Sequence, residues 1–152
     1  MGVKTVSLKG SLGLILSRTH RILATRLAQK FSEEGHDFSL DQWIVMMRLW
    51  VDDGQTQQQL ANKSFKDKTS ITRLIDTLEK KDLVVRVPDK IDRRAKLVYL
   101  TNKGKEIQKE LLPHAQGILN QAIDGIDPQD YATCERVLNA IYSNFNPGDD
   151  ED

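Results

Sequence analysis

A second cysteine is missing from this sequence: Cys134 is the only one among 152 residues. An intramolecular disulfide is therefore excluded, and such low cysteine usage suits a reducing cytosol better than an oxidising compartment. A long apolar run is missing too, because lysines and arginines interrupt the first 35 residues throughout, and no cleavage signal is present. We therefore expect a cytoplasmic protein that is neither exported nor inserted in a membrane.

The sequence also lacks clusters of catalytic or metal-binding residues. The three histidines, His20, His36 and His114, are scattered, and no metal-ligand spacing, phosphate-binding loop or nucleophile motif occurs. We therefore expect neither an enzyme nor a bound metal or other cofactor.

Net charge is zero, since 22 basic residues balance 22 acidic ones, but the charges are segregated. Residues 56–105 hold 13 basic and 6 acidic residues, a net charge of +7, whereas residues 106–152 hold 2 and 10, a net charge of −8. A basic middle segment suits contact with phosphates, although chance clustering would give the same pattern.

Apolar side chains recur at helical spacing along most of the chain. Capping-box pairs indicate helix starts at Ser39 with Gln42 and at Thr56 with Gln59, and Asp67 suits the N-cap of a third helix. The predicted helices cover residues 10–33, 40–51, 57–62, a segment after Asp67, residues 102–126 with a kink expected at Pro113, and a segment capped by Asp127.

Two runs rich in β-branched residues, 83–87 and 96–100, predict strands of a hairpin whose tip is charged. The order of helix, turn, helix and hairpin predicts a mainly α fold with a small β-hairpin wing, a winged helix-turn-helix. The second of the two short helices is then the recognition helix that enters the major groove of DNA.

Polar and basic side chains are predicted on the outer face of this recognition helix. Arg73 is the best candidate for reading a base, whereas lysines near the helix start suit phosphate contacts. An ordinary solvated helix face would look the same. The candidate DNA-binding residues are Lys66, Lys68, Thr69, Ser70, Thr72 and Arg73.

The wing carries a denser cluster of charge at Asp92, Arg93, Arg94 and Lys96. An arginine at such a tip can enter the narrow, electronegative minor groove. The carboxylate of Asp92 or Asp89 would hold that arginine extended before DNA arrives. The alternative is a loop whose charges only keep the protein soluble.

These segments resemble the MarR family of bacterial transcription regulators. The resemblance rests on Thr69-Ser70-Ile71-Thr72-Arg73-Leu74-Ile75-Asp76, Leu78-Glu79-Lys80, Leu83-Val84, Arg86, the wing from Asp89 through Asp92-Arg93-Arg94, Leu97-Val98-Tyr99-Leu100-Thr101 and Gly104. It extends over about residues 10–145 and implies a dimer whose terminal helices interlock, with Arg94 in the minor groove. Two departures stand out: Asp82 replaces the usual glycine, which an aspartate in a left-handed conformation would tolerate, and no cysteine lies near the first helix.

The expected organisation is a single MarR-like domain over residues 1–145. Its winged-helix lobe covers about residues 40–101, dimerisation helices cover about 10–33 and 102–145, and residues 146–152 form a disordered acidic tail. The amphipathic terminal helices support a dimer independently of the family, because their apolar stripes need a partner. Packing within one chain is the alternative. On the last stripe, Cys134 is expected to be a packed thiol rather than a redox sensor.

We therefore predict a homodimeric, double-stranded DNA-binding regulator, in particular a repressor, acting on a pseudo-palindromic operator. The alternative is a winged-helix module that binds another protein and no DNA. The resemblance also suggests a small-molecule effector. The side chains that could line its pocket are Arg18, His20, Arg21, Trp43, Met47 and Trp50. Buried aromatic residues at helical spacing are more often part of the core, so no ligand residue is assigned.

Overall fold

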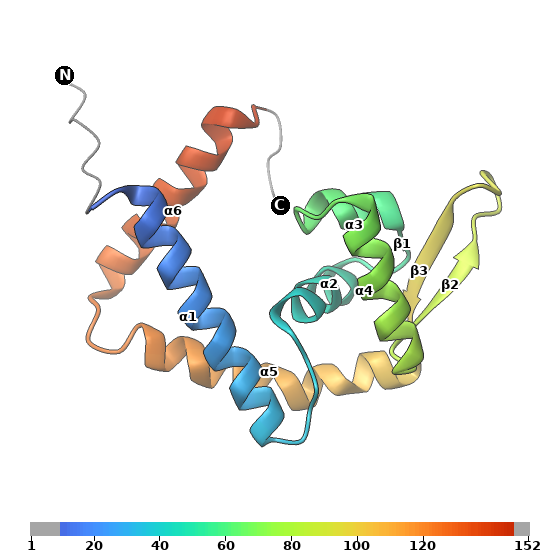
Figure 1. The fold of residues 1–152 in the computed structure, drawn as a ribbon, viewed down its shortest axis with the longest axis horizontal. Helices are drawn as coiled ribbons and strands as arrows, with labels where there is room; N and C mark the ends of the chain where they lie inside the picture. Colours follow the sequence, from blue (N-terminus) through green and yellow to red (C-terminus); the bar gives the residue numbers. More distant parts are fainter. Residues whose placement is uncertain (1–9, 148–152) are drawn as a thin grey trace. The chain divides into compact units, whose positions relative to one another are not determined.

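The computed structural model describes residues 10–147, so most of the predicted acidic tail, residues 148–152, lies outside the described residues. The chain forms two compact units, the first ending at Ile118 and the second beginning at Leu119. The first unit contains the predicted winged helix-turn-helix. Its elements are α1 (Leu12–Glu33), α2 (Leu40–Val51), β1 (Gln55–Thr56), α3 (Gln57–Lys63), α4 (Lys68–Lys80), β2 (Val84–Pro88), β3 (Lys96–Leu100) and most of α5 (Asn102–Ala122) (Figure 1).

The small sheet has three antiparallel strands in the order β1-β3-β2. The predicted hairpin is confirmed, with Val84 paired with Leu100 and Pro88 paired with Lys96. The third strand was not predicted, because the two residues of β1 are too few to show an alternating pattern. The hairpin follows directly after α4 and projects from it as the wing (Figure 1).

Both predicted capping boxes form. The backbone N–H of Gln42 donates to the Ser39 hydroxyl at 3.1 Å, and the N–H of Ser39 donates to the Gln42 side chain at 3.2 Å. Thr56 and Gln59 make the equivalent pair at 3.1 and 2.8 Å. Each pair binds backbone donors that have no partner within the helix, which defines where α2 and α3 begin.

The core of the first unit lies beneath α2, α3 and α4. The aromatic rings of Phe38 and Trp43 both pack on Phe31 at the end of α1, with centroid distances of 6.2 and 5.3 Å to the Phe31 ring. Buried aliphatic residues from α2, α3, α4, the hairpin segment and α5 join them: Val45, Met46, Leu49, Leu60, Ile71, Ile75, Leu78, Leu83, Val84, Val98 and Leu111. This shared core holds the two short helices and the wing base together.

Three helices of this unit end in the same hydrogen-bonded motif, in which the residue after the C-cap has a positive φ. At the end of α4 the N–H of Asp82 donates to the carbonyl of Glu79, and the next N–H, of Leu83, donates to that of Leu78. The residues with positive φ are Gly35 after α1 (84°), Phe65 after α3 (55°) and Asp82 after α4 (58°). The left-handed conformation expected of Asp82 is thus confirmed.

Gly104 allows α5 to approach the wing base. A Cβ at this position would lie 2.0 Å from the carbonyl oxygen of Leu83. The indole of Trp50 donates to the Gly104 carbonyl at 2.9 Å, which ties α2 to the same point. The glycine is therefore required by close packing of backbones.

The second unit consists of the last turn of α5 and of α6 (Pro128–Phe145). As predicted, Asp127 caps α6 by accepting from the N–H of Gln129 at 2.7 Å, and Pro128 occupies the first turn. The preceding helix continues through Pro113 but ends at Ala122, four residues earlier than predicted. No residue of α6 is buried, and Cys134 is exposed. The expectation of a packed thiol is therefore wrong for the single chain, because no residue between 10 and 147 buries Cys134.

Candidate nucleic-acid interface

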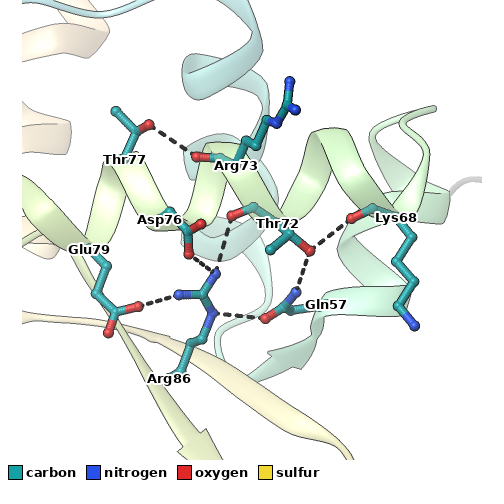
Figure 2. A network of polar contacts seen from close by, with 8 residues as sticks. All are labelled: Gln57, Lys68, Thr72, Arg73, Asp76, Thr77, Glu79 and Arg86. Carbon is teal, nitrogen blue, oxygen red and sulfur yellow. Dashed lines mark hydrogen bonds and ion pairs between the residues drawn. The ribbon is translucent and has the colours of Figure 1, made fainter.

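The start of α4 presents free polar and basic side chains. Asp67 caps the helix by accepting from the N–H of Ser70 at 2.7 Å. Beyond it, Lys68, Thr69 and Arg73 are exposed, and their side chains make no hydrogen bond or ion pair with any residue between 10 and 147. Figure 2 shows Lys68 and Arg73 extending away from the polar contacts behind the helix. These three residues are available to a ligand.

Three other predicted DNA-binding residues are already engaged within the chain. The hydroxyl of Ser70 donates to the Asp67 carboxylate at 3.2 Å, and that of Thr72 donates to the carbonyl of Lys68 at 2.8 Å. The Nζ of Lys66 lies 2.7 Å from a carboxylate oxygen of Asp41 in α2. The outward placement expected of Ser70 and Thr72 is therefore only partial, because both are half-buried. Helical spacing did not show these local and long-range acceptors.

Hydrogen bonds at this helix start also affect titration. The backbone and side-chain hydrogen bonds from Ser70 hold the pKa of the Asp67 carboxyl below its usual value of 3.8. The charged form is favoured because a carboxylate accepts these bonds and lies at the positive end of the helix dipole. Asp67 is thus ionised at neutral pH and keeps the start of α4 fixed.

A polar network behind α4 fixes the wing relative to the recognition helix (Figure 2). The guanidinium of Arg86, on β2, binds Asp76 and Glu79 at 2.6 Å each. It also donates to the side chain of Gln57 at 2.8 Å and to the carbonyl of Thr72 at 3.2 Å. One side chain thereby joins β2, α3 and α4. No separate role was expected of Arg86 from the sequence, although a single arginine within an apolar strand was a usable signal.

The carboxyl end of α4 is anchored as well. The Nζ of Lys81 donates to the carbonyl of Asp37, before α2, and to the side chain of Gln42 at 3.2 Å. It also lies 5.0 Å from the centroid of the Phe38 ring. From the other side, Lys103 donates to the carbonyl of Lys81 at 2.9 Å. Both ends of the recognition helix are therefore held by the surrounding unit.

The wing tip is closed by its two aspartates. The carboxylate of Asp89 accepts from the N–H of Ile91, and that of Asp92 accepts from the N–H of Arg94, each at 3.0 Å. The predicted contact between a carboxylate and an arginine side chain is therefore wrong: the aspartates hold the backbone turn instead. The side chains of Arg93, Arg94 and Lys96 are exposed, without hydrogen bonds or ion pairs to other described residues.

Comparison with known proteins shows to which family this chain belongs. The sequence model of the MarR family matches residues 38–96. The solved transcriptional regulator PA3341 is 32% identical, with 88% of this chain and 97% of that chain covered and a TM-score of 0.76. This chain belongs to the MarR family. Its predicted winged helix-turn-helix fold is thus confirmed, and it is a DNA-binding transcription regulator rather than an enzyme.

Other relatives extend over the same length. The regulator MhqR of Bacillus subtilis is 24% identical over 128 residues, which cover 84% of this chain and 87% of MhqR. A MarR regulator from Methanosarcina mazei is 26% identical, with 88% and 94% covered and a TM-score of 0.79. The same fold occurs at lower identity in reduced AbfR bound to DNA (21%, TM-score 0.70) and in BpsR of Bordetella bronchiseptica (19%, TM-score 0.82), whose DNA binding is regulated by 6-hydroxynicotinic acid.

The side chains considered for an effector pocket of this MarR-family chain do not form one cluster. Trp43 is buried and Trp50 half-buried, with ring centroids 5.3 Å apart, so both are core residues. The remaining four, Arg18, His20, Arg21 and Met47, are exposed. Among residues 10–147, no group of side chains has the arrangement of a metal site, and no helix is both long and apolar enough to cross a bilayer.

Proposed function

We propose that this chain acts in the cytoplasm as a homodimeric repressor that binds a pseudo-palindromic operator. The observation that carries the proposal is a set of exposed cations on the two elements that reach DNA in this fold. Lys68 and Arg73 lie on α4, and Arg93 and Arg94 lie at the wing tip. Thr69, exposed beside Lys68, and Lys96 at the base of the tip complete the proposed contact surface.

These cations suit two different parts of the duplex. Arg73 has the donor geometry to bind guanine O6 and N7 in the major groove, whereas Lys68 suits a phosphate. Arg94 is proposed to enter the minor groove, and Arg93 beside it is proposed to contact the DNA backbone, while Asp92 holds the turn of the wing. Because Lys66, Ser70 and Thr72 are engaged within the chain, we assign them a supporting role.

Dimerisation is supported by apolar side chains that one chain leaves exposed. On α1, Leu12, Leu14 and Ile22 are each at least half exposed, and Phe145 at the end of α6 is 83% exposed. A second copy of the chain would cover these stripes, and Cys134 with them. We propose residues 1–145 as one functional domain with its lobe at 40–101 and its dimerisation helices at 10–33 and 102–145. Two-fold symmetry would place the two recognition helices about 34–36 Å apart, one turn of DNA.

A small-molecule effector is proposed on the precedent of BpsR. An effector that bound one dimer geometry better than the other would change the spacing of the recognition helices and so the affinity for the operator. No effector residue is assigned.

The test is binding to random-sequence duplex DNA across a salt series, for wild type, Arg73→Ala and Arg94→Ala. We expect affinity to fall steeply with salt and both substitutions to weaken binding. An operator is then selected from a random duplex library. If wild type showed no salt-dependent binding to any duplex, repression at an operator would be excluded and a protein-interaction module would take its place.

A further inference from the structure

The tip of the wing carries an apolar side chain that the fold does not use. Ile91 is 96% exposed, the highest value for any large apolar residue between 10 and 147. Its backbone N–H donates to the Asp89 carboxylate at 3.0 Å, a bond that every residue except proline can make. Two further bonds between backbone atoms close the tip, from Asp89 to Ala95 at 3.0 Å and from Ala95 to Asp92 at 2.9 Å. The closed hairpin therefore does not depend on the side chain of Ile91.

Isoleucine is an unfavourable residue for this position. Turns favour glycine, asparagine, aspartate and serine, whereas β-branched side chains favour strands. The side chain also keeps its apolar surface in water, so folding gains nothing from burying it. Single exposed apolar residues are nevertheless common on protein surfaces. Ile91 is distinguished by its place in the loop that joins β2 to β3, at the projecting end of the wing (Figure 1), and by the charge around it.

The surroundings of Ile91 indicate what kind of partner it contacts. Residues 89–96 hold four basic and two acidic residues, and both carboxylates already accept backbone N–H groups of the tip. The side chains of Lys90, Arg93 and Arg94 are exposed and make no hydrogen bond or ion pair within residues 10–147. An apolar protein surface would take these three cations out of water without a counter-charge, whereas a DNA duplex supplies a phosphate for each. The free cations therefore favour DNA as the partner of the whole tip.

We propose that Ile91 is a further specificity-determining residue, whose side chain packs on the floor of the minor groove beside the proposed site of Arg94. This inference rests on the proposed operator binding. In the minor groove an A·T pair presents only acceptors, whereas a G·C pair adds the exocyclic amino group of guanine. An apolar side chain cannot accept a hydrogen bond from that amino group and would bury it without a partner. Ile91 therefore selects an A·T or T·A pair at the position that it contacts.

Arg94 and Ile91 respond to different properties of the same groove. A guanidinium responds to the negative potential of a narrow minor groove, which several neighbouring base pairs determine together. An apolar side chain responds to the chemical groups of the one base pair on which it packs. Isoleucine is among the apolar residues that minor-groove-binding proteins place against bases. Ile91 thus adds a preference at a single base pair that the charges of the wing do not supply.

The experiment compares wild type, Ile91→Ser and Ile91→Val on the operator selected with wild type. Each adenine of a half-site is replaced in turn by diaminopurine, which adds the minor-groove amino group of guanine and leaves the major-groove edge of adenine unchanged. Melting temperature and sedimentation are measured for every variant without DNA. Val51→Ser makes the matched change from an apolar to a polar side chain at the end of α2, where Val51 is 85% exposed, and is the control.

We expect Ile91→Ser to weaken operator binding by at least about fivefold without lowering the melting temperature, and Ile91→Val and Val51→Ser to bind within about twofold of wild type. At one position of the half-site, diaminopurine should weaken wild type by at least about fivefold and Ile91→Ser by less than about twofold.

Three results would overturn the inference. They are equal operator binding by wild type and Ile91→Ser, a diaminopurine effect that is the same in both proteins at every position, and a change of sedimentation in Ile91→Ser, which would make Ile91 a contact between copies of the chain. Each of these leaves wild-type operator binding intact. They therefore differ from failure of the proposed function, in which wild type itself binds no duplex.

Discussion

Arg86 on β2 and Asp76 on α4, ten positions apart along the chain, form an ion pair in which Nη2 and Oδ1 lie 2.6 Å apart. Their elements run in different directions, and the pair fixes the angle at which strand and helix meet. Only 15% of the Arg86 side chain is exposed, so solvent screens its side of the pair weakly. The planar guanidinium also binds Glu79 and Gln57, and such a fork permits only one geometry.

Replacing Arg86 tests this network. We expect Arg86→Met to lower the free energy of unfolding by about 2 kcal/mol, because Asp76 and Glu79 would face each other without a cation. Arg86→Lys should cost about 1 kcal/mol, since it keeps the charge but not the fork. Urea unfolding measures both, and Arg93→Met at the exposed wing tip should change stability by less than about 0.5 kcal/mol. Equal effects at positions 86 and 93 would contradict the structural role of the network.

The two glycines of α5 should respond in opposite directions. Gly104→Ala is expected to lower stability by about 3 kcal/mol, because its Cβ would overlap the carbonyl oxygen of Leu83 and backbone must move. Gly117→Ala has open space around its Cβ and should raise stability by about 0.5–1 kcal/mol, because alanine favours the helix. Thermal unfolding of both variants, followed by circular dichroism, measures these changes. A Gly104→Ala variant that melted at the temperature of wild type would contradict the close contact with Leu83.

Position 82 should favour glycine. With φ at 58°, Asp82→Gly is expected to raise the free energy of unfolding by up to about 1 kcal/mol. Asp82→Val should lower it by about 2 kcal/mol, because a β-branched side chain is disfavoured there. The bond from the Thr101 hydroxyl to the carbonyl of residue 82 is retained in both variants. Chemical denaturation would refute this explanation if valine were tolerated as well as glycine.

The cap of α4 should depend on pH. Because hydrogen bonds from Ser70 lower the pKa of Asp67 in the folded state, the stability that this carboxylate contributes is complete above its unfolded value of 3.8. That contribution is lost as pH falls through the lower, folded pKa. Asp67→Asn cannot titrate, so the advantage of wild type over this variant should shrink with acidification. Melting temperatures between about pH 2 and 6 test this, and a constant difference would show that the carboxylate is not the group involved.

The two lysines at the start of the recognition helix should differ in DNA binding. Lys68→Ala should reduce the slope of log affinity against log salt by about 0.9, the value for one lost phosphate contact. Lys66→Ala should reduce the slope by less, because Lys66 is paired with Asp41 at 2.7 Å. Filter binding or fluorescence anisotropy at several salt concentrations measures both slopes, and the reverse order would show that DNA displaces Asp41.

Sequence predicted the features whose causes are local. The capping boxes at Ser39 and Thr56, the cap at Asp67 and the strands on either side of the wing all depend on residues within a few positions of one another. Family resemblance and backbone chemistry together also predicted the left-handed Asp82. These signals were sufficient for the winged helix-turn-helix and for its recognition helix.

Long-range partners were not predictable in the same way. Asp41 is 25 positions before Lys66, and nothing in the helical spacing showed that the two would meet. The same holds for Gln57 and Thr72, whose side chains are 3.2 Å apart. For that reason, the sequence predicted more DNA-facing residues on α4 than the structure leaves free.

The Arg86 network has a consequence for the DNA itself. If α4 and the wing contact DNA as proposed, their connection through Arg86 requires a fixed number of base pairs between the major-groove bases and the minor-groove step that they contact. One inserted base pair would move the minor-groove step by about 3.4 Å along the axis and by about one tenth of a turn around it. The proposed operator would then be a phased sequence, in which a favourable base composition does not compensate for a change of spacing within a half-site.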